Sequence, residues 1–154
     1  MNTLLTIADI RAAVAAGRID AAEFLRGRWQ QLYRSHEQQP DPAWISLATA
    51  SQLEAQLAVL AQRDPADCPL YGVPFAVKDN IDVAGLPTTA HSKVLIDNIA
   101  ATDAVVTARL EAAGGVLLGK LATHEFALGG PSFDLPWPPA VNPWGGRHFP
   151  GGSS

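Results

Sequence analysis

Cysteine, basic side chains and long apolar runs are scarce in this sequence, and each scarcity excludes a class of protein. The single cysteine, Cys68, excludes a disulfide framework and a cysteine-rich zinc site. Eleven basic against fifteen acidic side chains give a net charge of −4, without the basic excess that binds nucleic acid. No apolar run approaches the roughly 18 residues of a membrane span, and Asp9 and Arg11 interrupt the run that a signal peptide needs. We therefore expect a cytoplasmic protein without nucleic-acid or membrane partners.

What is present is typical of a globular chain, because 47% of the 154 residues are apolar. The first 65 residues are predicted to be a helical lead-in. The pair Asp20 and Glu23 matches a helix-opening capping box, and Pro40 and Pro42 stop the helix that follows. Apolar spacing predicts helices over 6–16, 20–38 and 50–62, with a short apolar strand at 44–47.

After residue 65 the pattern changes to strand, helix, strand. An apolar strand is predicted over 71–78, continuing at 81–83 after a turn, and a second strand over 116–119. Between them a helix is predicted over 103–113, with its inward face formed by Val105, Val106 and Leu110. This order indicates a βαβ unit with a parallel sheet, and hence an α/β core.

The last 24 residues, Pro131 to Ser154, are predicted to form a long loop. They contain six prolines and four glycines, which exclude regular structure. Loops of this length inside globular proteins are uncommon and usually functional. No metal site is expected, because Leu128 stands where a His124-Glu125 zinc helix would need its second histidine.

Two stretches contain candidate catalytic residues. Lys78 closes an apolar run and precedes Asp79 and Asn80, so it is either an ordinary lysine at a strand end or a buried, neutral general base. Ser153 and Ser154 follow two glycines, which is typical of a flexible terminus or of a tight turn that presents a hydroxyl.

Considered together, these stretches resemble the amidase signature family. The resemblance rests on residues 71–80 (YGVPFAVKDN), 119–139 (GKLATHEFALGGPSFDLPWPP) with the following Asn142-Pro143-Trp144, and 150–154 (PGGSS). It extends from about residue 5 to the last residue. Residues 72–90 are most similar to allophanate hydrolases, whereas the sequence from His91 onward is more similar to general amidases.

The resemblance implies amide C–N cleavage by a Ser–Ser–Lys triad without metal or cofactor. Lys78 would be the general base and Ser153 the bridging serine, joined to Gly152 by a cis peptide bond. An ordinary lysine is protonated at neutral pH, so this chemistry needs burial around Lys78, and a charge pair with Asp79 would oppose it. Ser154 would contribute a hydrogen bond to the lysine or the adjoining backbone, with Gly151 and Gly152 shaping the turn.

The family's nucleophile lies downstream of the block that ends at Ser154. The resemblance therefore implies a truncated fragment: the N-terminal portion of one amidase domain, with a helical lead-in (1–65), the start of a mixed α/β core (66–154) and no activity by itself. Its substrate would be a small-molecule amide, with allophanate as the first choice and a generic carboxamide as the second. A homodimer is one possible state of a full-length form. A related version is the amidase-type subunit of a tRNA amidotransferase. The alternative is a non-catalytic remnant or interaction module that needs a second chain.

Overall fold

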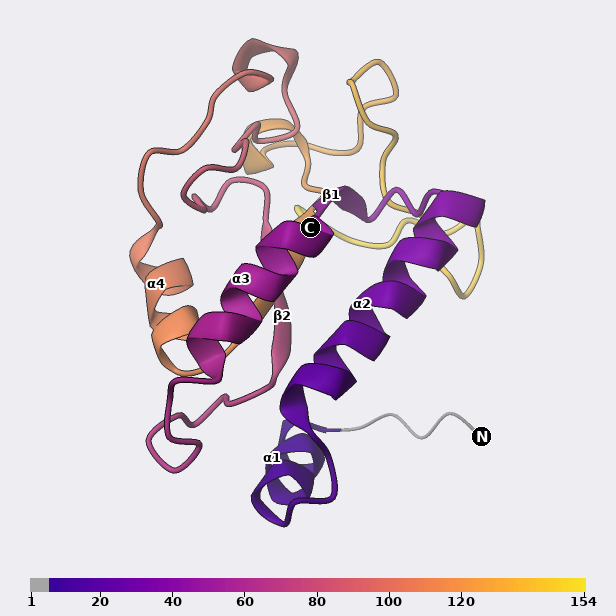
Figure 1. Ribbon diagram of the computed structural model, residues 1–154. Helices are drawn as coiled ribbons and strands as arrows, with labels where there is room; N and C mark the ends of the chain where they lie inside the picture. Colours follow the sequence, from indigo (N-terminus) through magenta and orange to yellow (C-terminus); the bar gives the residue numbers. More distant parts are fainter. Residues whose placement is uncertain (1–5) are drawn as a thin grey trace. The chain divides into compact units, whose positions relative to one another are not determined.

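The computed structural model describes residues 6–154 (Figure 1). These residues form two compact units. The first unit comprises residues 6–38, 48–75 and 108–118, and the second comprises 39–47, 76–107 and 119–154. Residues 1–5, where the apolar run considered as a signal peptide begins, lie outside the described residues. The domain division expected at residue 65 stays a prediction from the sequence.

Three helices dominate the first unit, close to where the sequence predicts them. They are α1 (Ile7–Ala15), α2 (Ala21–Gln38) and α3 (Ala50–Leu60). The Asp20 carboxylate accepts a hydrogen bond from the Glu23 N–H at 2.8 Å, as the predicted cap requires. Gly17 has a φ of 65° directly after the first helix, which is the left-handed conformation expected of a terminating glycine. The second helix ends just before the two prolines that were predicted to stop it.

The core of the first unit is aliphatic. Leu25 on α2 is fully buried, and Leu53, Leu57 and Leu60 form the buried face of α3 that their spacing predicts. The two helices are also joined at their surface, where Arg26 and Glu54 form an ion pair at 2.7 Å.

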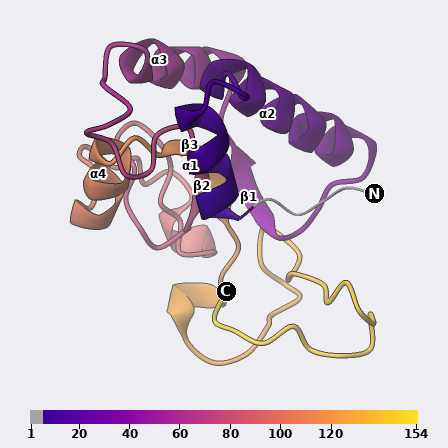
Figure 2. The same ribbon diagram turned by 90° about the horizontal axis from the view of Figure 1, so that it is seen from below.

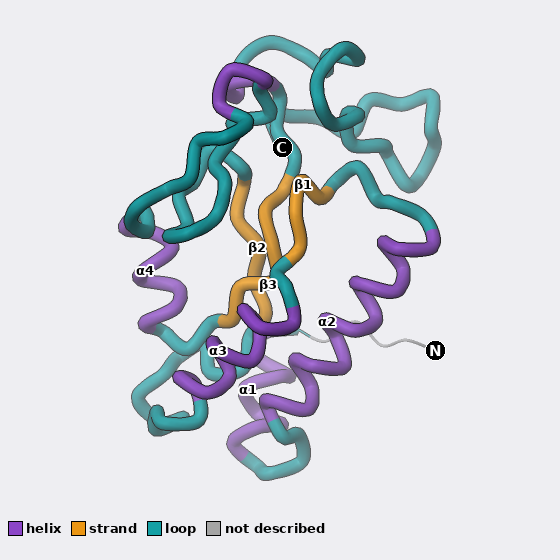
Figure 3. Tube along the Cα trace, turned by 45° about the horizontal axis from the view of Figure 1, so that its top comes forward, coloured by secondary structure: helices purple, strands orange, loops and turns teal. Residues whose placement is uncertain are grey.

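The strands form a small mixed sheet, shown in orange in Figure 3. They are β1 (Trp44–Leu47), β2 (Pro74–Lys78) and β3 (Val116–Leu121), in the order β1-β3-β2. β1 pairs with β3 in antiparallel fashion. β2 runs parallel to β3, because Val116 N–H donates to Val73 O at one end and Asp79 N–H donates to Leu121 O at the other. The predicted mixed α/β fold is confirmed.

Two local predictions were wrong. Residues 81–83 are not a strand, because the Ile81 N–H turns back to Lys78 O and the Asp82 carbonyl accepts from Ala104 N–H. The helix α4 (Val105–Ala112) does not turn its valines inward: Val105 is 68% and Val106 is 46% exposed.

A polar residue sets the rotation of α4. Thr107 is fully buried and donates from its hydroxyl to the Asp82 carbonyl at 2.8 Å, which turns the neighbouring valines outward; Leu110 is half-buried. Apolar periodicity alone could not predict this, because the buried position carries a hydroxyl.

The second unit ends in the predicted long loop. Residues 131–154 contain neither helix nor strand (Figure 2). Two short 3-10 helices precede it, η1 (Lys93–Leu95) and η2 (Glu125–Ala127). Over residues 6–154, no helix has the length and apolar character needed to cross a membrane.

The interior of the second unit is polar. All buried polar or charged residues of the described chain belong to it: Asp79, Thr88, Thr89, His91, Ser92, Thr107, Lys120 and Thr123. Burying such groups is costly unless each finds partners, so this interior depends on directed contacts rather than on apolar packing. The candidate catalytic residues lie in the same unit.

We expect Leu25→Ala to lower the free energy of unfolding by about 2–5 kcal/mol, because it removes a fully buried side chain and leaves a cavity. Val59→Ala on α3 is the matched control, since Val59 is 53% exposed and its truncation should change stability by no more than about 0.5 kcal/mol. Urea denaturation followed by circular dichroism measures both. Equal effects would contradict the packing described for the first unit.

Candidate active site

Lys78 stands at the last position of β2 and is half-buried. Its Nζ atom donates a hydrogen bond to the hydroxyl of Ser153, 75 residues further along the chain. The structure therefore places in contact the two residues that the family resemblance predicts to be the base and the bridging serine. A lysine amine in contact with a hydroxyl can take up and return a proton through it.

The segment that carries Ser153 has an unusual backbone. Gly151 has a φ of 97°, and the peptide bond between Gly152 and Ser153 is cis, the geometry expected from the resemblance. Ser154 is exposed, and Lys78 Nζ is hydrogen-bonded to Ser153 rather than to Ser154.

His124 holds this segment. Its backbone N–H donates to the Ser153 carbonyl at 2.6 Å, and its ring stacks on Phe149 with a centroid separation of 5.5 Å. A Cβ atom on Gly152 would collide with the His124 imidazole, so a larger residue there would have to displace the ring. The Nδ1 atom of His124 lies 2.9 Å from the Gly129 carbonyl. Sequence reasoning considered His124 only as a metal ligand and missed this role.

Asp79, the residue after Lys78, has partners of its own. Its side chain is fully buried and contacts Lys120 and Thr89. The Oδ2 atom accepts from the Thr89 N–H at 3.0 Å and from the Thr89 hydroxyl at 2.5 Å. The Oδ1 atom lies 3.1 Å from Lys120 Nζ, an ion pair that is not aligned as a hydrogen bond. The charge partner of Asp79 is thus Lys120 and not Lys78.

Lys120 is the residue of this site that sequence reasoning missed. It lies on β3 with no exposed surface, and its Nζ also donates to the Pro87 carbonyl and the Thr88 hydroxyl, each at 3.1 Å. The available signal was its position inside the apolar run Val116–Leu121, where a lysine must be either buried or at an edge.

A second polar cluster lies beside the first. The buried Ser92 hydroxyl donates to Glu125 at 2.6 Å, and the His91 N–H donates to the Thr89 hydroxyl at 3.0 Å. His91 Nδ1 accepts from the Thr123 N–H at 3.4 Å, which leaves Nε2 to donate to the Trp137 carbonyl at 2.9 Å. These contacts tie the start of the long loop to the polar interior.

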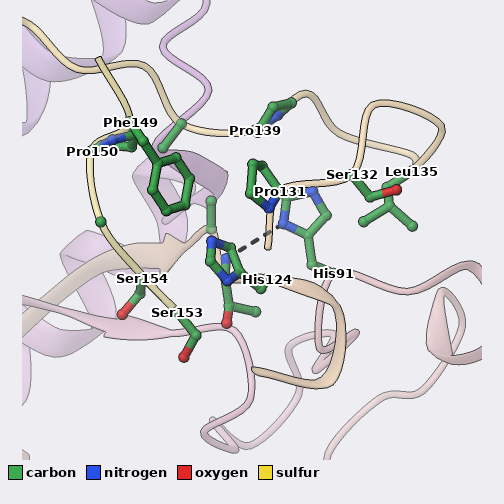
Figure 4. A pocket seen from close by; sticks show the side chains of 14 residues that line it. His91, His124, Pro131, Ser132, Leu135, Pro139, Phe149, Pro150, Ser153 and Ser154 are labelled. Atoms are coloured by element: carbon green, nitrogen blue, oxygen red, sulfur yellow. Dashed lines mark hydrogen bonds between the residues drawn. The ribbon is translucent and has the colours of Figure 1, made fainter. Parts of the chain in front are cut away.

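A cavity of about 60 Å³ lies behind the Ser153 segment (Figure 4). Its walls are mainly rings and prolines, among them His91, His124, Pro131 and Phe149. Ser153 and Ser154 also line the cavity, and their hydroxyls point away from the His124 and Phe149 rings.

One loop carboxylate near the cavity has a perturbed pKa. Hydrogen bonds from the Ser132 hydroxyl and the local backbone hold the pKa of Asp134 below its ordinary value. Among residues 6–154, no group of three histidine, cysteine or acidic side chains is arranged to hold a metal ion.

Comparison with known proteins identifies the family of the chain. The Amidase family matches residues 31–154. The chain is 36% identical over 151 residues to an amidotransferase component from Nitratidesulfovibrio vulgaris, the A-type subunit of its glutamyl-tRNA(Gln) amidotransferase. That match covers 97% of this chain and 30% of the relative.

Superposition on solved structures also finds proteins with amidase activities in their names. The allophanate hydrolase of Kluyveromyces lactis superposes with a TM-score of 0.81 at 31% identity, over 97% of this chain and 24% of that one. The peptide amidase of Stenotrophomonas maltophilia superposes with a TM-score of 0.80 at 28% identity, over 98% and 32%. The chain thus spans about a third or less of the length of these relatives. From its sequence blocks, its fold and these matches, the chain belongs to the amidase (amidase signature) family.

Proposed function

We propose that this chain supplies the base and the bridging hydroxyl of an active site that cleaves amide C–N bonds. The observation that carries the proposal is the hydrogen bond from Lys78 Nζ to Ser153 Oγ. The proposal assigns to these two residues the roles that the sequence resemblance implies, the family's lysine and its bridging serine. The remaining contacts of the second unit hold this pair in place through His124 and the polar interior.

In the proposed reaction, a nucleophilic hydroxyl gives its proton to Ser153 as it attacks the amide carbonyl carbon, and Ser153 passes its own proton to the neutral Lys78 amine. The resulting tetrahedral intermediate collapses when the C–N bond breaks and the proton returns through Ser153 to the leaving nitrogen. Water then attacks the acyl-enzyme by the same proton route and releases the acid.

The nucleophile belongs, in this proposal, to sequence outside these 154 residues. Two serines of the described chain are engaged elsewhere: Ser92 donates to Glu125 and Ser132 donates to Asp134. The oxyanion donors would come from the same outside segment. Activity is therefore proposed for the complete protein, in the cytoplasm, and not for this chain by itself.

Allophanate is the proposed substrate. The resemblance of residues 72–90 to allophanate hydrolases supports it, as does the superposition on the allophanate hydrolase of Kluyveromyces lactis. A second candidate is amide transfer as the amidase-type subunit of an amidotransferase, favoured by the 36% identity to an amidotransferase subunit over nearly the full chain. The proposed oligomer is a homodimer in the first case and a complex of different chains in the second.

Replacing Lys78 tests the base. In the complete protein, we expect Lys78→Ala to lower kcat at least about a thousandfold, because the unit then has no proton acceptor. The matched control is Lys93→Ala, which removes an exposed lysine of the same chain. Steady-state assays of ammonia release measure both. Near-normal turnover by Lys78→Ala would contradict the proposal, and a complete protein without amide cleavage would favour a non-catalytic module.

Replacing Ser153 tests the relay. We expect Ser153→Ala to suppress the burst of acyl-enzyme formation, because the proton path from the nucleophile to Lys78 is interrupted. Ser35→Ala, on the exposed surface of α2, is the control and should keep the full burst. Rapid-quench measurement of the acyl-enzyme decides between them, and an undiminished burst in Ser153→Ala removes the residue from the mechanism.

A substrate panel separates hydrolysis from transfer. We expect kcat/KM to be highest for allophanate among allophanate, glutamine and a simple aliphatic carboxamide. A preference for glutamine, with ammonia passed to a second acceptor, would instead support the amidotransferase role. Equal values for all three would indicate a general amidase and contradict the choice of allophanate.

A further inference from the structure

The ion pair of Asp79 and Lys120 has no part in the proposed proton relay, although it lies next to it in the chain. Both side chains are fully buried, with 3.1 Å between Oδ1 and Nζ. Lys120 has two further acceptors, the Pro87 carbonyl and the Thr88 hydroxyl, and Asp79 has two donors on Thr89.

Stability alone gives a weak reason for such a pair. Removing two charges from water costs free energy that their attraction recovers only in part, and apolar side chains of similar volume often serve the fold as well. The pair is nevertheless supported on both sides by directed contacts. These contacts favour a role for the pair beyond the stability of the fold, and its neighbours indicate which role.

The neighbour that matters is Lys78. Successive side chains of a strand point to opposite faces, so Lys78 and Asp79 diverge at the end of β2. Lys78 reaches Ser153, whereas Asp79 reaches Lys120. A buried carboxylate without a counter-charge one residue from Lys78 would favour its ammonium form, the form that cannot act as a base.

We infer that Lys120 is a positioning residue that neutralises Asp79, so that the carboxylate can anchor the end of β2 without holding a proton on Lys78. The anchoring is done by the Thr89 contacts of Asp79 and by its backbone, whose N–H donates to Leu121 O and whose carbonyl accepts from Ala90 N–H. The counter-charge comes from Lys120. This inference rests on the proposed function for its purpose but can be measured without it.

The other ionisable side chains on these segments are engaged with different partners. His91 contacts Thr123 and Trp137, and Glu125 accepts from Ser92. His124 touches the Ser153 backbone, and its Nδ1 faces Gly129. Asp82 has an exposed side chain. Asp79 and Lys120 are thus the buried charges whose balance is altered by the variants below.

The test measures how readily Lys78 reacts with acetic anhydride as pH is varied, because an amine is acylated only in its unprotonated form. Peptide mass spectrometry reads each lysine of the chain separately: Lys78 is half-buried, Lys93 is exposed and Lys120 is buried. Lys93 serves as the internal standard, and thermal melts confirm that each variant is folded.

Opposite shifts are expected from the two single variants. Lys120→Met leaves the Asp79 anion alone, so acylation of Lys78 at about pH 8 should slow by at least about threefold. Asp79→Asn leaves the Lys120 cation alone, so acylation should accelerate by a similar factor. Of the two variants, Asp79→Asn is expected to destabilise the fold less, because Lys120 keeps its Pro87 and Thr88 acceptors. The double variant should return to the original rate.

Thr88→Val is the structural control. It removes an acceptor of Lys120 without changing any charge, so it should lower the melting temperature and leave the pH dependence of Lys78 acylation unchanged. Shifts of the same sign in both single variants, an unchanged profile in folded Asp79→Asn, or an equal shift in Thr88→Val would each overturn the inference.

The two proposals fail separately. Opposite acylation shifts together with an active Lys78→Ala protein would retain the counter-charge role and refute the amidase role of Lys78. An inactive Lys78→Ala protein whose Asp79→Asn profile does not move would retain the amidase role and refute the counter-charge.

Discussion

The backbone hydrogen bond from Asp79 N–H to Leu121 O fixes the register on which the polar interior depends. It sets the end of β2 against the end of β3, so that the carboxylate of Asp79 meets the ammonium of Lys120 and the side chain of Lys78 is left for Ser153. A shift of one residue in either strand would exchange the faces of its side chains and so break the contact of Lys78 with Ser153 or that of Asp79 with Lys120.

The two units contrast in how they are held together. The first depends on leucine packing between helices, which tolerates changes of shape as long as volume is kept. The second buries hydroxyls, a carboxylate, an imidazole and a lysine, each of which needs a partner in a particular direction. Directed partners specify positions more narrowly than apolar contacts do, which suits the unit that must bring Lys78 to Ser153.

The sequence was most informative where short patterns act locally. The cap of α2, the leucine face of α3 and the proline-rich loop needed no tertiary information. The pairing of Lys78 with Ser153 came from resemblance, since no local rule relates residues 75 positions apart. Lys120 and the rotation of α4 were missed for one physical reason: buried polar groups are chosen by distant partners, here Asp79 for Lys120 and the Asp82 carbonyl for Thr107.

The close packing of Gly152 against the His124 imidazole makes two distant positions interdependent. Any side chain at 152 must displace the ring, and loss of the ring removes the reason for having no side chain there. An exchange of the segment 149–154 between relatives must therefore include the residue at position 124 as well. An engineer who transplanted the serine turn alone would carry over its chemistry without its support.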